Sequence, residues 1–181
     1  MTTIDQARHF AETVHAGQTR KGAAREPYIT HLAEVAALVA EFGGSPAAIM
    51  AAWLHDTVED CGTSPDEIAR QFGPDVAYVV AQLTDDKSLP KAERKALQII
   101  HAPGKTRDAT LVKICDKLSN VRTVGDAPPV HWDEERQVAY LDRAQHVVSA
   151  LPGGATWARD RFSATLARSR KLVADRHARS V

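Results

Sequence analysis

The stretch WLHDTVED, Trp53 to Asp60, places one histidine and three acids within six positions at the end of an apolar segment. Ser45-Pro46 precedes this segment, and a serine cap followed by proline is typical of a helix start. Acids near a helix C-terminus face the negative end of its dipole, and Asp56 and Asp60 add a like-charge pair four residues apart. The pattern therefore indicates that a positive ligand is missing from the sequence.

On a continuous helix, which turns by about 100° per residue, the polar side chains of this stretch would lie on adjoining faces. His55 would then lie over Glu59, and Asp56 over Asp60. Histidine nitrogen beside carboxylate oxygen suits a divalent first-row metal such as Mn, Fe or Zn. A solvated helix end explains the pattern about as well, so this stretch alone leaves the two interpretations open.

Helical patterns continue on both sides of this stretch, and no convincing alternation of β-branched and polar residues competes with them. We expect an all-α fold, a single domain of about nine helices around one core. The expected helices cover residues 4–16, 27–42, 46–60, 66–72, 75–84, 91–100, 108–124, 132–151 and 156–177. Residues 1–154 would form the core, and residues 155–181 a basic helix packed on it or extending from it.

The charge balance argues against a polyanionic partner for the whole chain. The 181 residues carry 23 basic and 23 acidic side chains, so no net field attracts nucleic acid or an anionic membrane. The segment 155–181 is an exception, with seven Arg or Lys against two Asp. A solvated helix face is the favoured explanation, and a phosphate or partner patch is the alternative. We expect a small-molecule partner and no nucleic acid.

Cysteine usage and hydropathy indicate a cytoplasmic protein. Cys61 and Cys115 are the only cysteines, which gives neither a disulfide framework nor a paired-cysteine metal motif. The start MTTIDQARHF lacks the apolar segment of a signal peptide, and no run of 18 apolar residues occurs. Membrane insertion is therefore not expected, and association of identical copies through a helix face stays open.

Two other predicted helices offer partners for the histidine and acids. Tyr28 and His31 lie three residues apart in an otherwise apolar helix, and Asp116, Asn120 and Thr123 share one face of a later helix. A lone histidine in an apolar stretch is more often structural than a ligand. A carboxylate, an amide and a hydroxyl along one stripe look like the wall of a site.

His31, the pair His55-Asp56 and Asp116 follow the H…HD…D pattern of the HD-domain metal-dependent phosphohydrolases. Longer stretches resemble the hydrolase domain of RelA/SpoT proteins, and especially the stand-alone small alarmone hydrolases of the metazoan type. These stretches are AETVHAGQTRKG, EPYITH, AAWLHDTVED, FGPDVAYVV, LTDDKSLPKAERK and VKICDKLSNVRT. The resemblance covers residues 11–151. It implies an all-helical HD fold, a Mn2+ ion, and hydrolysis of ppGpp or pppGpp to pyrophosphate and GDP or GTP.

The resemblance also implies roles for individual residues. The metal ligands would be His31, His55, Asp56 and Asp116. Glu59 and Asp60 match the catalytic acids beside the metal. Glu59 would take a proton from the attacking water, and Asp60 would orient that water or assist the leaving oxygen.

Further matches imply a nucleotide site. Its substrate-binding residues would be Arg20, Lys21, Tyr28, Asn120 and Thr123. The guanidinium of Arg20 suits a bidentate phosphate contact or stacking on a base, and the ammonium of Lys21 suits a point-charge contact. Trp132 and Tyr140 could add an aromatic wall, although a core position is the favoured explanation for each.

Two departures from the family pattern keep other functions open. Leu32 stands where the family usually has proline, and the loop GAARE, residues 22–26, varies where substrate would bind. The alternatives are a phosphohydrolase for another nucleotide with a 3′- or 2′-phosphate, such as NADPH, and a non-catalytic helical binding module. The synthetase region of the long RelA/SpoT proteins is not expected in a chain of this length.

Overall fold

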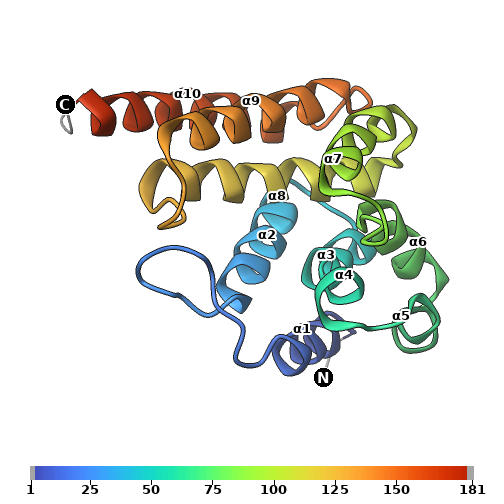
Figure 1. Cartoon of the computed structure of the whole chain (residues 1–181). Helices are drawn as coiled ribbons and strands as arrows, with labels where there is room; N and C mark the ends of the chain where they lie inside the picture. The colour runs from blue at the N-terminus through green and yellow to red at the C-terminus, as the bar shows by residue number, and fades with distance from the viewer. Residues whose placement is uncertain (1–2, 179–181) are drawn as a thin grey trace.

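The computed structural model describes residues 3–178, and these residues form helices and no strand (Figure 1). The all-α prediction is confirmed. The elements are α1 (Thr3–Val14), α2 (Ile29–Glu41), α3 (Pro46–Leu54), α4 (Thr57–Cys61), α5 (Pro65–Phe72), α6 (Pro74–Leu83), α7 (Lys91–Ile100), the short 3-10 helix η1 (Ala102–Gly104), α8 (Arg107–Asp126), α9 (Glu134–Ala150) and α10 (Thr156–Ala178).

Helix α8 is the centre of the fold. Figure 1 shows it between α9 and α10 on one side and α2 and α3 on the other, and it packs against all four. Helices that are buried on every side are normally apolar all round. In α8, however, Lys113, Asp116 and Lys117 are buried beside apolar residues such as Ile114 and Leu118. Polar groups held this deeply require partners, which concentrates chemistry at the middle of α8.

The helix predicted over residues 46–60 is divided in two. Helix α3 ends at Leu54, α4 begins at Thr57, and His55 and Asp56 form the turn between them. The prediction that His55 lies over Glu59 on one continuous helix is therefore wrong. Two side chains explain the break, because His55 Nδ1 bonds Ala52 O and Thr57 Oγ1 bonds Leu54 O. These side-chain bonds compete with helix continuation at that point.

Helix α10 packs along α8 and α9 (Figure 1). A Cβ atom at Gly125 of α8 would come within 2.5 Å of Ser169 Oγ on α10 and 3.0 Å of its Cα. Glycine is thus required for this close approach. Residue 179, one of the predicted basic residues, lies outside the described part of the chain. The division of the chain at residue 154 stays a prediction.

The arginines of α10 are bound to the rest of the fold. Arg161 pairs with Glu41 at 3.0 Å, and Arg170 with Asp142 at 2.7 Å. Arg159 donates to carbonyls at the end of α9, those of Val148, Leu151, Pro152 and Gly154. The arginines of α10 therefore mainly form ion pairs and hydrogen bonds within the molecule.

None of the helices in residues 3–178 is long and apolar enough to cross a membrane. Both cysteines are free thiols. Cys115 is buried in the core, and burial raises the pKa of its thiol. It therefore behaves as a small apolar residue.

Candidate metal centre and nucleotide pocket

Three buried side chains from separate elements converge on one point. His31 comes from α2, His55 from the turn after α3, and Asp116 from α8. Their ligand atoms all lie within 4.8 Å of one another. Asp116 Oδ1 is 3.4 Å from His31 Nε2 and 3.9 Å from His55 Nε2. Two imidazole nitrogens and a carboxylate oxygen at this spacing could hold a metal ion.

Asp56, the fourth predicted ligand, adjoins this group. Its Oδ2 lies 3.2 Å from His55 Nε2 and accepts a hydrogen bond of 2.5 Å from the Tyr28 hydroxyl. Burial opposes ionisation of Asp56, but His55 and His31 lower its pKa below the ordinary value. Burial, together with the charge of Asp56, raises the pKa of Tyr28, so this phenol stays a donor. Tyr28 thus orients the carboxylate.

The contact that His55 makes through Nδ1 leaves its second ring nitrogen, Nε2, available for a cation. Its Nδ1 lies 2.8 Å from the carbonyl oxygen of Ala52, and a carbonyl can only accept. Nδ1 therefore carries a proton, and in the neutral imidazole Nε2 presents a lone pair toward Asp56. That Nε2 atom is buried without a hydrogen-bond partner. Buried polar atoms rarely lack a partner. The Nε2 atom of His55 and the carboxylate oxygen of Asp56, which face each other, therefore fit a bound metal ion.

A hydrogen-bond relay sets the tautomer of His31 in the same sense. His31 Nδ1 lies 2.8 Å from Ser119 Oγ, and that hydroxyl donates to Glu34 Oε2 at 2.8 Å. The single hydroxyl proton is used on Glu34, so Ser119 accepts from Nδ1–H and leaves Nε2 free. Arg122 completes the relay with an ion pair of 2.6 Å to Glu34. Such outer partners orient metal ligands.

The sequence interpretation missed Glu34 and Ser119. Each follows a predicted ligand by three residues, Glu34 after His31 and Ser119 after Asp116. Residues three apart share a helix face. That spacing could have indicated both residues, but only packing of α2 on α8 brings them together.

The charge of Asp116 is held by neighbouring donors. Its Oδ1 accepts from Asn120 Nδ2 at 2.6 Å, and its Oδ2 lies 3.3 Å from Lys117 Nζ. Burial would raise the pKa of Asp116, but Lys117, the contact with His31 and Lys113 hold it well below the ordinary value. The carboxylate is therefore ionised and able to bind a cation.

The two predicted catalytic acids lie on α4, outside the three-residue metal group. Glu59 accepts from the backbone N–H of Asp85 at 3.3 Å and pairs with Arg94 at 3.4 Å. Its partial burial and the charge of Asp85 raise its pKa, which makes it a stronger base. Asp60 is more exposed, at 37%, and pairs with Lys87 at 2.5 Å.

All five residues predicted to bind substrate line one pocket of about 200 Å3: Arg20, Lys21, Tyr28, Asn120 and Thr123. Arg20 Nη2 donates to Thr123 Oγ1 at 2.8 Å, which ties the basic loop to α8. Because His31 also lines this pocket, the pocket opens onto the metal group.

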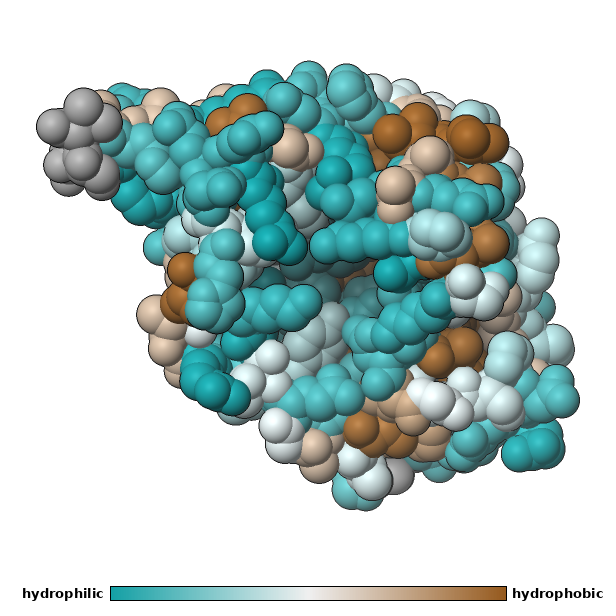
Figure 2. Space-filling view, in the orientation of Figure 1, coloured by the Kyte–Doolittle hydropathy of each residue, from teal (hydrophilic) through white to brown (hydrophobic). Residues whose placement is uncertain are grey.

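Trp132 and Tyr140 complete the wall of this nucleotide pocket. Their ring centroids are 5.3 Å apart, and the Arg136 guanidinium lies 4.9 Å over the Trp132 ring. Both rings also pack against the hydrophobic core. Wall and core positions are therefore compatible for both residues. Figure 2 shows a mostly hydrophilic face that is hollowed near its centre.

The sequence matches the HD domain family over residues 7–151. It is 45% identical to the guanosine-3′,5′-bis(diphosphate) 3′-pyrophosphohydrolase MESH1 of Xenopus tropicalis, covering 83% of this chain and 85% of that protein. Identity to MESH1 of Homo sapiens is 42%, covering 82% and 84%. The solved structure of a metazoan SpoT ortholog that hydrolyses ppGpp superposes with a TM-score of 0.89 and 34% identity, covering 95% of this chain and 97% of that one. This chain belongs to the HD-domain family.

Proposed function

We propose that the protein is a Mn2+-dependent guanosine-3′,5′-bis(diphosphate) 3′-pyrophosphohydrolase that converts ppGpp or pppGpp to pyrophosphate and GDP or GTP. The observation that carries this proposal is the juxtaposition of two sites. The metal group of His31, His55 and Asp116 opens onto a pocket lined by basic and aromatic residues. The relatives named above act on ppGpp.

The proposed metal ligands are His31, His55, Asp56 and Asp116. A bound Mn2+ ion would neutralise phosphoryl oxygens and lower the pKa of water. The protein's own contribution is orientation: Tyr28 holds Asp56, and the relay through Ser119 binds His31 by Nδ1 and turns its Nε2 toward Asp116. These contacts make the donor atoms ready before the ion arrives.

Glu59 is the proposed general base. Its raised pKa makes its carboxylate a better proton acceptor, and Arg94 and the Asp85 N–H fix its position. Asp60 is proposed to orient the water or to assist the leaving oxygen. Asp60 is more exposed, so the partly buried Glu59 with its raised pKa is the favoured group for proton transfer.

The nucleotide is proposed to occupy the pocket between the basic loop and α8. Arg20 and Lys21 supply positive charge for phosphate, Asn120 and Thr123 supply hydrogen bonds, and Tyr28 supplies an aromatic face. Cross-loop bonds hold this geometry, since Tyr28 N donates to Gln18 O at 2.8 Å. A formed pocket reduces the entropy lost on binding.

The test measures pyrophosphate and GDP released from ppGpp by chelator-stripped protein, with and without added Mn2+. We expect release only with the metal, and loss of release in Glu59→Ala. Asp66→Ala, an exposed acid on α5, is the matched control and should retain full activity. Undiminished turnover by a clean Glu59→Ala preparation would overturn the role of Glu59.

A panel of other nucleotides tests the substrate. Exclusive turnover of NADPH or of a nucleotide 3′-monophosphate would replace ppGpp by one of the alternatives. No turnover of any nucleotide by folded, Mn2+-loaded protein would favour a non-catalytic binding module. A cytoplasmic location is also proposed, on the ground that both cysteines are free thiols.

A further inference from the structure

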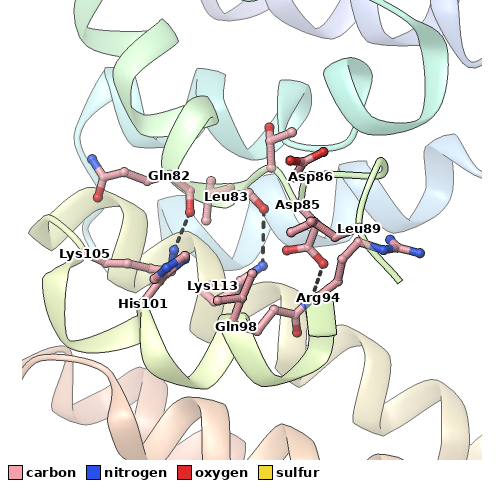
Figure 3. A pocket seen from close by; sticks show the side chains of 12 residues that line it. Gln82, Leu83, Asp85, Asp86, Leu89, Arg94, Gln98, His101, Lys105 and Lys113 are labelled. Atoms are coloured by element: carbon pink, nitrogen blue, oxygen red, sulfur yellow. Dashed lines mark hydrogen bonds between the residues drawn. The ribbon is translucent and has the colours of Figure 1, made fainter. Parts of the chain in front are cut away.

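A second cavity, of about 260 Å3, shares no lining residue with the nucleotide pocket (Figure 3). It is enclosed by the end of α6, the following loop, α7, η1 and α8. Asp85 and Arg94 line this cavity and also contact the Glu59 carboxylate. The cavity therefore adjoins the proposed catalytic base, but neither Glu59 nor a proposed metal ligand lines it.

Two lysines give this cavity its positive charge. Lys105 Nζ donates to the carbonyl oxygen of Gln82, and Lys113 Nζ donates to that of Leu83 at 3.5 Å (Figure 3). Lys113 is only 6% exposed. Within residues 3–178, neither ammonium has a carboxylate oxygen within 4.0 Å. A buried cation without an anionic partner is costly, so the buried Lys113 and the half-buried Lys105 beside one cavity point to a missing anion.

The acids that line the cavity bond other groups, although the charge of Asp85 still acts on both lysines. Asp85 Oδ2 accepts from Gln98 Nε2 at 2.5 Å, and Asp86 Oδ1 accepts from the backbone N–H and hydroxyl of Ser88. The carbonyls at the end of α6 contribute about half a negative charge. Burial lowers the pKa of both lysines, to about 8 for Lys105, and the nearby Asp85 only partly opposes this, so an anion would stabilise their charged forms.

We propose that this cavity, here called the lysine pocket, is a binding site for a phosphate oxyanion held by Lys105 and Lys113. Lysine ammonium groups act as point charges toward phosphate and keep further N–H donors after bonding one carbonyl each. The oxyanion has two sources: free phosphate or pyrophosphate, or the distal phosphate of a pyrophosphate substrate whose nearer phosphate lies at the metal group. The second source rests on the proposed function.

The first experiment measures binding of inorganic phosphate and pyrophosphate to chelator-stripped protein by calorimetry. Lys105→Gln keeps an N–H donor for the Gln82 carbonyl and removes the charge. We expect at least a fivefold loss of affinity for one of the anions in this variant. Lys105→Arg, which keeps the charge, and Lys171→Gln, an exposed lysine on α10, should bind within twofold of the original chain. Thermal melts verify that each variant is folded.

The second experiment separates the two sources by kinetics with Mn2+. If the distal phosphate of the substrate enters the lysine pocket, Lys105→Gln raises KM for ppGpp at least fivefold and leaves KM for guanosine 5′-diphosphate 3′-monophosphate unchanged. If free phosphate enters, KM for ppGpp is unchanged and inhibition by phosphate is lost. Either result supports the site.

Equal anion affinity in Lys105→Gln and the original chain, together with unchanged kinetics, would overturn the proposal and leave the lysines as caps of α6. Failure of the proposed function is a separate result. Protein that does not hydrolyse ppGpp can still be titrated with phosphate, so the binding experiment decides the lysine pocket by itself.

Discussion

The charges of α10 and those of the metal group are arranged in opposite ways. On α10, Arg161 and Arg170 meet acids of the core, and Arg159 meets carbonyls at the end of α9. In the metal group, Nε2 of His31 and of His55 faces a carboxylate, and His55 Nε2 has no hydrogen-bond partner. One region is complete as folded, and the other is complete only with a cation.

This difference separates structural charges from functional ones. Exposed ion pairs contribute about 0–1 kcal/mol, so the arginines of α10 are explained by packing and solubility. An unsatisfied buried polar atom costs about 1–3 kcal/mol. A protein retains such an unsatisfied atom where the binding of a ligand offsets the free energy that it costs. The comparison explains why the sequence with more charge, residues 155–181, is not the region where we expect chemistry.

The largest effect is expected at Asp116. Asp116→Asn removes the anionic ligand but keeps the size of the side chain, and pyrophosphate release from ppGpp should fall at least about 1000-fold, equivalent to about 4 kcal/mol of transition-state stabilisation. Asp142→Asn is the matched change in the α10 contact and should retain activity within about twofold. Similar losses of pyrophosphate release in both variants would show that the metal group and the α10 contacts do not differ in function.

Metal removal should change stability through the metal group alone. Mn2+ at 100 times its Kd stabilises a folded protein by about 2.7 kcal/mol, which corresponds to a rise in Tm of about 5–10 °C at this chain length. Thermal melts of stripped protein with and without Mn2+ measure this rise. Asp116→Asn should lose it and Asp142→Asn should keep it. An equal rise in Asp116→Asn would place the bound ion elsewhere.

A smaller effect is expected at Ser119, which touches the proposed ligand His31 without being a ligand. Ser119→Ala leaves the Nδ1–H of His31 without its acceptor, so the tautomer is no longer fixed, and Mn2+ affinity should fall about tenfold. Titration of Mn2+ by electron paramagnetic resonance measures the affinity directly. Ser163→Ala, an exposed hydroxyl on α10, is the control. Unchanged Mn2+ affinity in Ser119→Ala would mean that Ser119 contributes to packing and does not orient His31.

The smallest effect is expected at Arg170. Arg170→Ala breaks an ion pair whose two side chains are 42% and 49% exposed, so we expect a loss of stability below about 1 kcal/mol and unchanged activity. Denaturant unfolding and ppGpp hydrolysis measure the two quantities. A large loss of activity would mean that α10 takes part in the site.

Much of the fold was predictable because its signals are local. Periodic apolar residues and proline or serine starts predicted the helices, and the family motifs predicted the residues that the structure gathers around the metal group and the nucleotide pocket. The break at His55-Asp56 was not predicted, since the side-chain bonds that cause it compete with an equally acceptable continuous helix.

The sequence by itself determined the helical fold and the residue types of a metal and phosphate site, because helix periodicity and metal chemistry depend on neighbouring positions and on side-chain identity. Tertiary structure alone decided which ring nitrogen of His31 is bound to Ser119, that Asp85 and Arg94 link Glu59 to a second cavity, and that Lys105 and Lys113 share that cavity. Those properties depend on contacts between residues up to 88 positions apart, such as His31 with Ser119, which only the packing of helices can create.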